Sequence, residues 1–146
     1  MRSLFDLELA IERVDADADP QQAAAELLAI AEEVFEHWLV AKGVDPTTET
    51  REGFRLLALH RQGTRGDPSF NACRETCREL AYYYNLVTMQ PTDAEITDRA
   101  NMMKMISSHL YLFISGKMQV AELGDFCCSS RPIRQGDMNN TVTKEA

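Results

Sequence analysis

Four side chains that could bind a soft metal ion lie in the second half of the chain: His60, Cys73, Cys77 and His109. The two cysteines are four residues apart, so a helix would place both thiols on one face. Cys73 and His109 lie on consecutive antiparallel helices, each about 22–24 Å from the turn expected at 88–93, so they would stand at the same level of the bundle. Because thiolate and imidazole ligands suit tetrahedral zinc, these residues form a candidate Cys₂His₂ site. The alternative is that both thiols simply fill a core stripe as small apolar groups.

A second candidate site is the basic loop that precedes a helix start at Asp67-Pro68. Free N–H groups at a helix N-terminus favour an anion, and Arg61 and Arg65 could clamp a phosphate or carboxylate beside Ser69. Two features count against such a site: the loop lacks the Gly-Lys-Ser/Thr ending of a phosphate-binding P-loop, and Asp67 would repel an anion. The candidate anion-binding residues are Arg61, Arg65 and Ser69.

A third candidate is a polar ridge on the helix expected at 68–88, made of Asn71, Arg74, Arg78 and Tyr82. Such a ridge is usually a solvated face with ion pairs one turn apart. Arginine and tyrosine are also enriched where proteins bind one another. The ridge is therefore a candidate partner-binding surface.

No catalytic motif stands out in the chain. Arg55 and His60 have a spacing found in some all-α ribonuclease domains, but five helical residues turn the two side chains about 140° apart. There is no Gly-x-Ser-x-Gly sequence or repeated Glu-x-x-His pair. The sequence favours a non-enzymatic protein without a cofactor; the alternative is a catalytic protein or one that binds zinc.

Aspartate-proline pairs give the strongest structural signal. Asp19-Pro20, Asp45-Pro46 and Asp67-Pro68 each combine a preferred N-cap with a proline that suits the first helical position. Thr92 and Glu95 have the spacing of a capping box. Gly43 and Gly63 are expected to end helices.

These signals predict an all-α antiparallel bundle of about five helices, at 3–14, 20–42, 46–62, 68–88 and 93–122. They form one domain over residues 1–123. The composition after Gly124 turns polar, so 124–146 is expected to be an extended or disordered tail, which contains Cys127 and Cys128.

The last predicted helix is apolar around its whole circumference, because Lys104 is the one permanently charged residue between Ala100 and Gly116. A helix of this kind must be covered on every side. Either it is central in the bundle or it forms a subunit interface. We expect a homodimer through this helix, since twofold dimers are the commonest assembly.

The charge of the chain is unevenly distributed. The net charge is −8, which argues against nucleic-acid binding. Residues 1–50 carry twelve acidic and three basic groups, whereas residues 51–78 carry six arginines against three acidic groups. This basic island either pairs with the acidic first third or meets an anionic ligand or an acidic protein partner.

No apolar run approaches the roughly 20 residues that span a bilayer, and the acidic first residues do not resemble an export signal. We therefore expect a cytoplasmic chain with reduced cysteines and no membrane contact. Two functions remain. One is a homodimeric interaction or regulatory protein with an Arg/Tyr surface. The other is a ligand- or metal-binding bundle, with or without catalytic activity.

Overall fold

The computed structural model describes residues 1–123 and confirms an all-α bundle. Its helices are α1 (Leu4–Arg13), α2 (Pro20–Ala41), α3 (Arg55–Gly66), α4 (Arg74–Met89) and α5 (Ile96–Val120), with a short 3₁₀ helix, η1 (Pro68–Cys73), before α4. The expected tail at 124–146, including Cys127 and Cys128, lies outside the described residues. In that described part, no helix is both long and apolar enough to cross a membrane.

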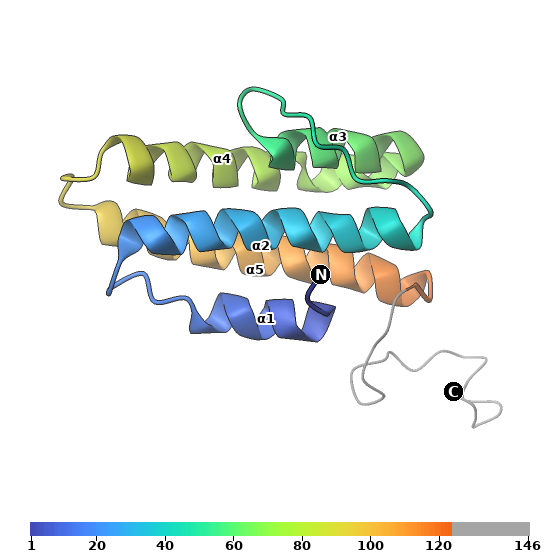
Figure 1. Ribbon diagram of the computed structural model, residues 1–146, viewed down its shortest axis with the longest axis horizontal. Coiled ribbons are helices and arrows are strands. Elements are labelled where there is room, and N and C mark those ends of the chain that lie inside the picture. Colours follow the sequence, from blue (N-terminus) through green and yellow to red (C-terminus); the bar gives the residue numbers. More distant parts are fainter. Residues whose placement is uncertain (124–146) are drawn as a thin grey trace.

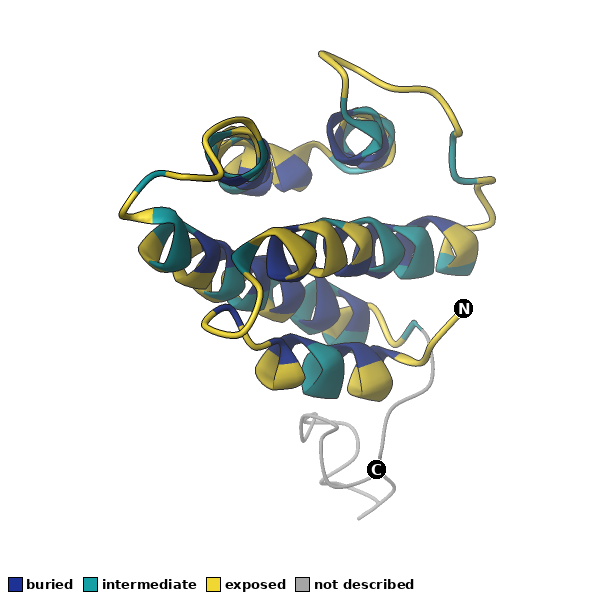
Figure 2. Cartoon of the chain, turned by 60° about the vertical axis from the view of Figure 1, so that its left-hand side comes forward, coloured by how far each residue is buried: buried dark blue, intermediate teal, exposed yellow. Residues whose placement is uncertain are grey.

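Helices α2 and α5 form the centre of the bundle (Figure 1). Both contact α4, and α3 packs against α2 and α4 on the same side. Helix α1 closes the opposite side by packing against α2 and α5. Each helix turns a buried stripe inward and an exposed stripe outward (Figure 2), as expected of helices around one core.

Aromatic rings fill the end of the core near η1. Phe70 is fully buried, and its ring centroid lies 4.8 Å from that of Trp38, 6.0 Å from Phe35 and 5.7 Å from Phe113. These separations are those of stacked and edge-to-face aromatic pairs. Phe70 therefore attaches η1 to both central helices.

Two predicted helix starts are confirmed with their caps. The Ser3 hydroxyl accepts a hydrogen bond from the Asp6 backbone N–H at 3.1 Å. The Asp19 carboxylate accepts one from the Gln22 N–H at 3.0 Å, with Pro20 at the first helical position. Gly43 has a φ of 76°, so it ends α2 as predicted.

The helix predicted at 46–62 is wrong over its first half, because α3 begins only at Arg55. Residues 44–50 have no regular secondary structure, and most of them are exposed (Figure 2). Side chains of α3 satisfy the backbone of this segment. Gln62 bonds to the Asp45 carbonyl and the Thr47 N–H, and Arg55 donates to the Thr47 carbonyl at 2.8 Å. The segment therefore needs no helical hydrogen bonds of its own.

Two other predicted boundaries also differ. The helix predicted at 68–88 is divided into η1 and α4, and Asp67 caps η1 by accepting from the Ser69 N–H at 3.0 Å. The predicted capping box of Thr92 and Glu95 does not form. Asp93 instead accepts from the Glu95 N–H at 2.8 Å, and α5 begins at Ile96.

Gly63 does not end a helix but lies inside α3, because the Phe70 ring occupies the space beside it. A Cβ at Gly63 would lie 2.7 Å from Cδ2 of Phe70. Because Phe70 is held by aromatic rings of α2 and α5, it has little freedom to move. A side chain at Gly63 would therefore push η1 away from α3.

We predict that Gly63→Ala lowers the free energy of unfolding by about 1–3 kcal/mol, the usual cost of overpacking a core. The measurement is urea denaturation followed by circular dichroism. Gly66→Ala is the matched control in the same helix, since nothing lies within 4 Å of its Cβ position. The control should change stability by less than about 0.5 kcal/mol. Equal stability of the Gly63→Ala variant and the wild type would contradict the packing described.

Candidate functional site

A tight turn brings Arg51 to the face formed by α3, η1 and α4. Arg51 and Phe54 exchange two backbone hydrogen bonds, of 2.9 and 3.0 Å. Between them, Glu52 and Gly53 have φ values of 54° and 86°. Positive φ at both central residues is the conformation of a two-residue hairpin turn, and glycine supplies the second at little cost. The Glu52 carboxylate then lies against Arg78 of α4, at 2.9 and 3.0 Å from its guanidinium nitrogens.

Four arginines from the turn, α3 and α4 surround a cavity of about 120 Å³. We call it the Arg cavity; its lining residues are Arg51, Leu57, His60, Arg61, Thr64, Asn71, Arg74 and Arg78. The arginines and Asn71 supply hydrogen-bond donors, and Leu57 supplies an apolar wall. A cavity of this size holds one small group rather than a whole drug-sized ligand.

The positive charge of the Arg cavity is only partly neutralised. Arg78 forms the ion pair with Glu52, and the pKa of that exposed carboxyl is lowered by its hydrogen bond with Arg78. Arg74 lies 3.9 Å from Glu75, and both side chains are mostly exposed. Arg61 has no ion pair or hydrogen bond with any side chain of residues 1–123. The cavity therefore presents an excess of positive charge to a ligand.

His60 lines the cavity and belongs to a buried group of three residues with Cys73 and Cys77, which do not line it. His60 is 7 % exposed, and its Nε2 lies 2.8 Å from the Phe70 carbonyl oxygen. The pKa of Cys73 is lowered to about 6, chiefly by a hydrogen bond from the Cys77 thiol. A hydrogen bond from His60 also lowers it, and together the two outweigh burial, which raises this pKa. The same bond raises the pKa of Cys77, because its thiol donates to Cys73. Burial lowers the pKa of His60, but the bonds with Cys73 and Phe70 raise it by more.

The predicted Cys₂His₂ layer is only partly assembled. His60, Cys73 and Cys77 come together, but His109 lies on the exposed face of α5. Helix α5 turns Met103, Ile106 and Leu110 into the core, and this rotation carries His109 outward. Within residues 1–123, no three His, Cys, Asp or Glu side chains are arranged to hold a metal ion.

The predicted anion loop is divided by the structure. Arg61 lines the Arg cavity, whereas Arg65 is exposed outside it. The Ser69 hydroxyl donates to Asp67 at 2.7 Å, and Lys117 of α5 lies 3.3 Å from the Asp67 carboxylate. Asp67 and Ser69 are thus used to join η1 to α5.

The predicted partner-binding ridge lies beside the Arg cavity. Asn71, Arg74 and Arg78 line the cavity, and Tyr82 is 60 % exposed one turn further along α4. The sequence interpretation missed Arg51 and Thr64. Gly53 is the one local signal of this turn, because glycine adopts positive φ at little cost, and it does not show which helix Arg51 approaches.

Arg55 and His60 share no site. Arg55 lies 2.6 Å from Glu36 and 3.6 Å from Glu32, so it joins α3 to α2. His60 faces the Phe70 carbonyl instead. The two side chains have different partners, as their separation of about 140° around a helix predicts, so they do not form the pair that the ribonuclease-like spacing would require.

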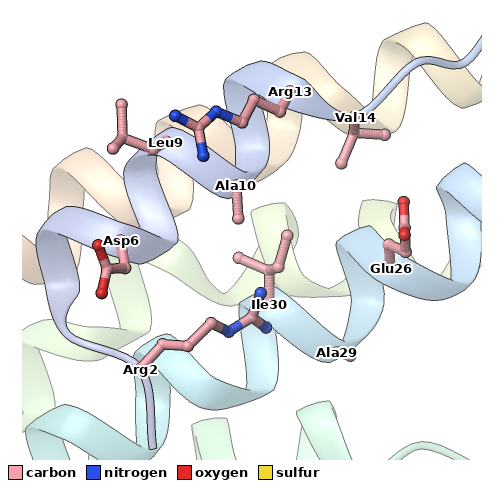
Figure 3. A pocket seen from close by; sticks show the side chains of 9 residues that line it. All are labelled: Arg2, Asp6, Leu9, Ala10, Arg13, Val14, Glu26, Ala29 and Ile30. Carbon is pink, nitrogen blue, oxygen red and sulfur yellow. The ribbon is translucent and has the colours of Figure 1, made fainter.

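A different hollow, of about 470 Å³, lies between α1 and α2 (Figure 3). Its charged side chains, Arg2, Asp6, Arg13 and Glu26, are balanced in number. Arg2 also pairs with Glu33 at 3.1 Å. This hollow has no excess of positive or negative charge, whereas the Arg cavity is lined by arginines without a carboxylate. The Arg cavity is therefore the stronger candidate site.

No protein-family model matches the chain, and no curated protein or solved structure matches it either.

We predict that Cys73 ionises with a midpoint near pH 6, measured by the ultraviolet absorbance of its thiolate. Because this pKa is lower than that of an ordinary thiol, the thiolate stabilises the fold at higher pH, and this contribution is lost as the pH falls through about 6. Cys73→Ser should abolish the transition. Cys77→Ala should move its midpoint upward, because the donor to Cys73 is lost. An absorbance titration unaffected by Cys73→Ser would contradict the prediction.

Proposed function

We propose that this chain is a non-enzymatic interaction protein that binds an anionic group of an acidic partner in the Arg cavity. The observation that supports the proposal is the convergence of four arginines on one cavity, with Arg61 free of partners among residues 1–123. Guanidinium groups bind carboxylates and phosphates through paired hydrogen bonds, which are stronger than neutral ones. An anion would satisfy donors that the protein itself leaves open.

Binding is favoured over catalysis by what the other polar groups already do. The His60 ring is held by the Phe70 carbonyl, and the Thr64 hydroxyl donates to the His60 carbonyl at 2.9 Å. Neither group is placed as a free base or nucleophile. The net charge of −8 also disfavours a long polyanion such as nucleic acid, because most of the surface would repel it.

We predict that inorganic phosphate raises the Tm of the wild-type protein and binds Arg61→Gln at least roughly 10-fold more weakly, as expected for the loss of a charge-assisted hydrogen bond. Arg65→Gln removes the same charge from the same helix outside the cavity, so it should bind like the wild type. Differential scanning fluorimetry over a phosphate series measures both. Equal responses of the two variants would show that the cavity does not bind the anion.

A second part of the proposal is a homodimer through α5. Its core-facing side is covered by α2, α4 and α1, but its outer face exposes Met105, Leu112 and Val120 by 54, 60 and 74 %. At 100° per residue, Met105 and Leu112 fall in one arc of roughly 80° with Met102, His109 and Gly116. Such a long apolar stripe is characteristic of a covered surface.

The order of residues along this stripe suits a twofold partner. When two α5 helices lie antiparallel about His109, Met102 of each copy faces Gly116 of the other. A long side chain opposite a glycine allows close packing, and a twofold axis repeats the contact. We therefore propose that a second copy of the chain covers this face.

We predict that light scattering at tens of micromolar gives a dimer for the wild type and a monomer for Leu112→Asp, because a carboxylate would be buried at the interface. Phe5→Asp is the control, since Phe5 on α1 is also 60 % exposed and lies outside the stripe. That variant should remain dimeric. A wild-type monomer would rule out this interface.

A further inference from the structure

A second hollow, of about 410 Å³, adjoins the Arg cavity and has the opposite character. We call it the acidic hollow; its lining residues are Glu52, Phe54, Leu57, Glu75, Arg78, Glu79, Ala81, Tyr82 and Asn85. Leu57 and Arg78 line both spaces, so the two lie side by side, with the Arg78 side chain between them. A ligand seated in the Arg cavity would therefore extend directly into the acidic hollow.

Three carboxylates and two aromatic rings give the acidic hollow its chemistry. Glu52 is tied to Arg78, whereas Glu79 is exposed and has no ion pair with residues 1–123. Tyr82 is 60 % exposed, and the Phe54 ring is fixed edge-on against Tyr84 at 5.7 Å. Carboxylates beside aromatic rings suit a lysine or arginine side chain, which combines a cation with an apolar stem.

We infer that the ligand of these two spaces is a phosphorylated peptide that carries a basic residue close to the phosphorylated one. This inference rests on the proposed anion-binding function and names its partner class. The phosphoryl group lies among the arginines of the Arg cavity, and the basic side chain lies between Glu79 and Tyr82. The peptide backbone passes over the Glu52–Arg78 ion pair that separates the two spaces.

A phosphoryl group fits the Arg cavity better than a carboxylate does. It carries a charge of about −1.5 to −2 and three acceptor oxygens, enough to engage several guanidinium groups at once. A single carboxylate accepts fewer bonds and leaves more of the positive charge unbalanced. A nucleic acid suits the pair of spaces less well, because its next phosphate would meet the carboxylates of the acidic hollow.

The spacing of the two groups follows from the helix that carries both spaces. Arg74 and Arg78 line the Arg cavity, whereas Arg78, Tyr82 and Asn85 line the acidic hollow, so the two centres are about one to two turns of α4 apart. One turn advances about 5.4 Å, and an extended peptide advances about 3.3 Å per residue. The basic residue is therefore expected about two or three positions from the phosphorylated one.

The test uses the full chain and fluorescent peptides in anisotropy titrations. The probe is a glycine-rich peptide with one phosphoserine and one arginine, placed two, three or four positions away on either side. It is compared with the same peptides carrying serine for phosphoserine, or glutamate for arginine. We expect at least one phosphoserine–arginine spacing to bind about 10-fold tighter than its glutamate counterpart, and the serine peptide to bind weakest.

Two variants test whether the preference for the arginine peptide over the glutamate peptide comes from the acidic hollow. Glu79→Lys should reverse it, so that the glutamate peptide binds better than the arginine peptide while inorganic phosphate still binds. Glu12→Lys on α1 changes the net charge equally and should keep the arginine preference. This charge exchange separates recognition in the acidic hollow from a general attraction of basic peptides to an acidic protein.

The remaining outcomes are distinguishable. Arg61-dependent binding of inorganic phosphate without an arginine preference would overturn the phosphopeptide inference and leave the anion site standing. Loss of phosphate binding as well would overturn both. A 5′-phosphorylated single-stranded oligonucleotide that binds tighter than every phosphopeptide would replace the peptide with a nucleic acid and overturn the inference.

Discussion

The burial of Phe70 joins the candidate site to the core. Its ring packs against Trp38, Phe35 and Phe113, so the short η1 helix is held between α2 and α5. The backbone carbonyl oxygen of Phe70 lies 2.8 Å from Nε2 of His60 and 3.2 Å from Sγ of Cys73. One residue therefore fixes the helix that carries the cavity-lining Asn71, and also the buried His60–Cys73–Cys77 group, of which His60 lines the cavity. A displacement of this ring would move both.

The other walls of the Arg cavity are also held by contacts with the rest of the bundle. Helix α3 is tied to α2 through Arg55 and to the 45–47 segment through Gln62, and both contacts lie between residues far apart in sequence. The Arg51–Phe54 turn is closed by its two backbone hydrogen bonds and by the Glu52–Arg78 pair. Because these backbone elements are already fixed, ordering them costs little conformational entropy when a ligand binds, and the main entropic cost falls on the arginine side chains.

Local patterns in the sequence predict the bundle well, and fail where distant residues decide. Asp19-Pro20 starts α2 because its cap is local, but Asp45-Pro46 starts no helix because Gln62, seventeen residues beyond Asp45, supplies the hydrogen bonds. The ridge of Asn71, Arg74 and Arg78 is visible on one helix face, whereas the place of Arg51 depends on positive φ angles at Glu52 and Gly53. His109 is misplaced because the rotation of α5 is set by packing against α2 and α4, and helical rise alone does not show it.

The basic island of residues 51–78 does not serve to neutralise the acidic first third. Of its six arginines, only Arg55 pairs with that part of the described chain, through Glu32 and Glu36. Arg78 and Arg74 pair with Glu52 and Glu75 inside the island, and Arg61 pairs with neither part. Guanidinium groups that converge on one cavity repel one another over distances shorter than the Debye length of about 8 Å. This repulsion opposes folding, and a bound anion would relieve it, which supports the proposed role of the cavity in anion binding.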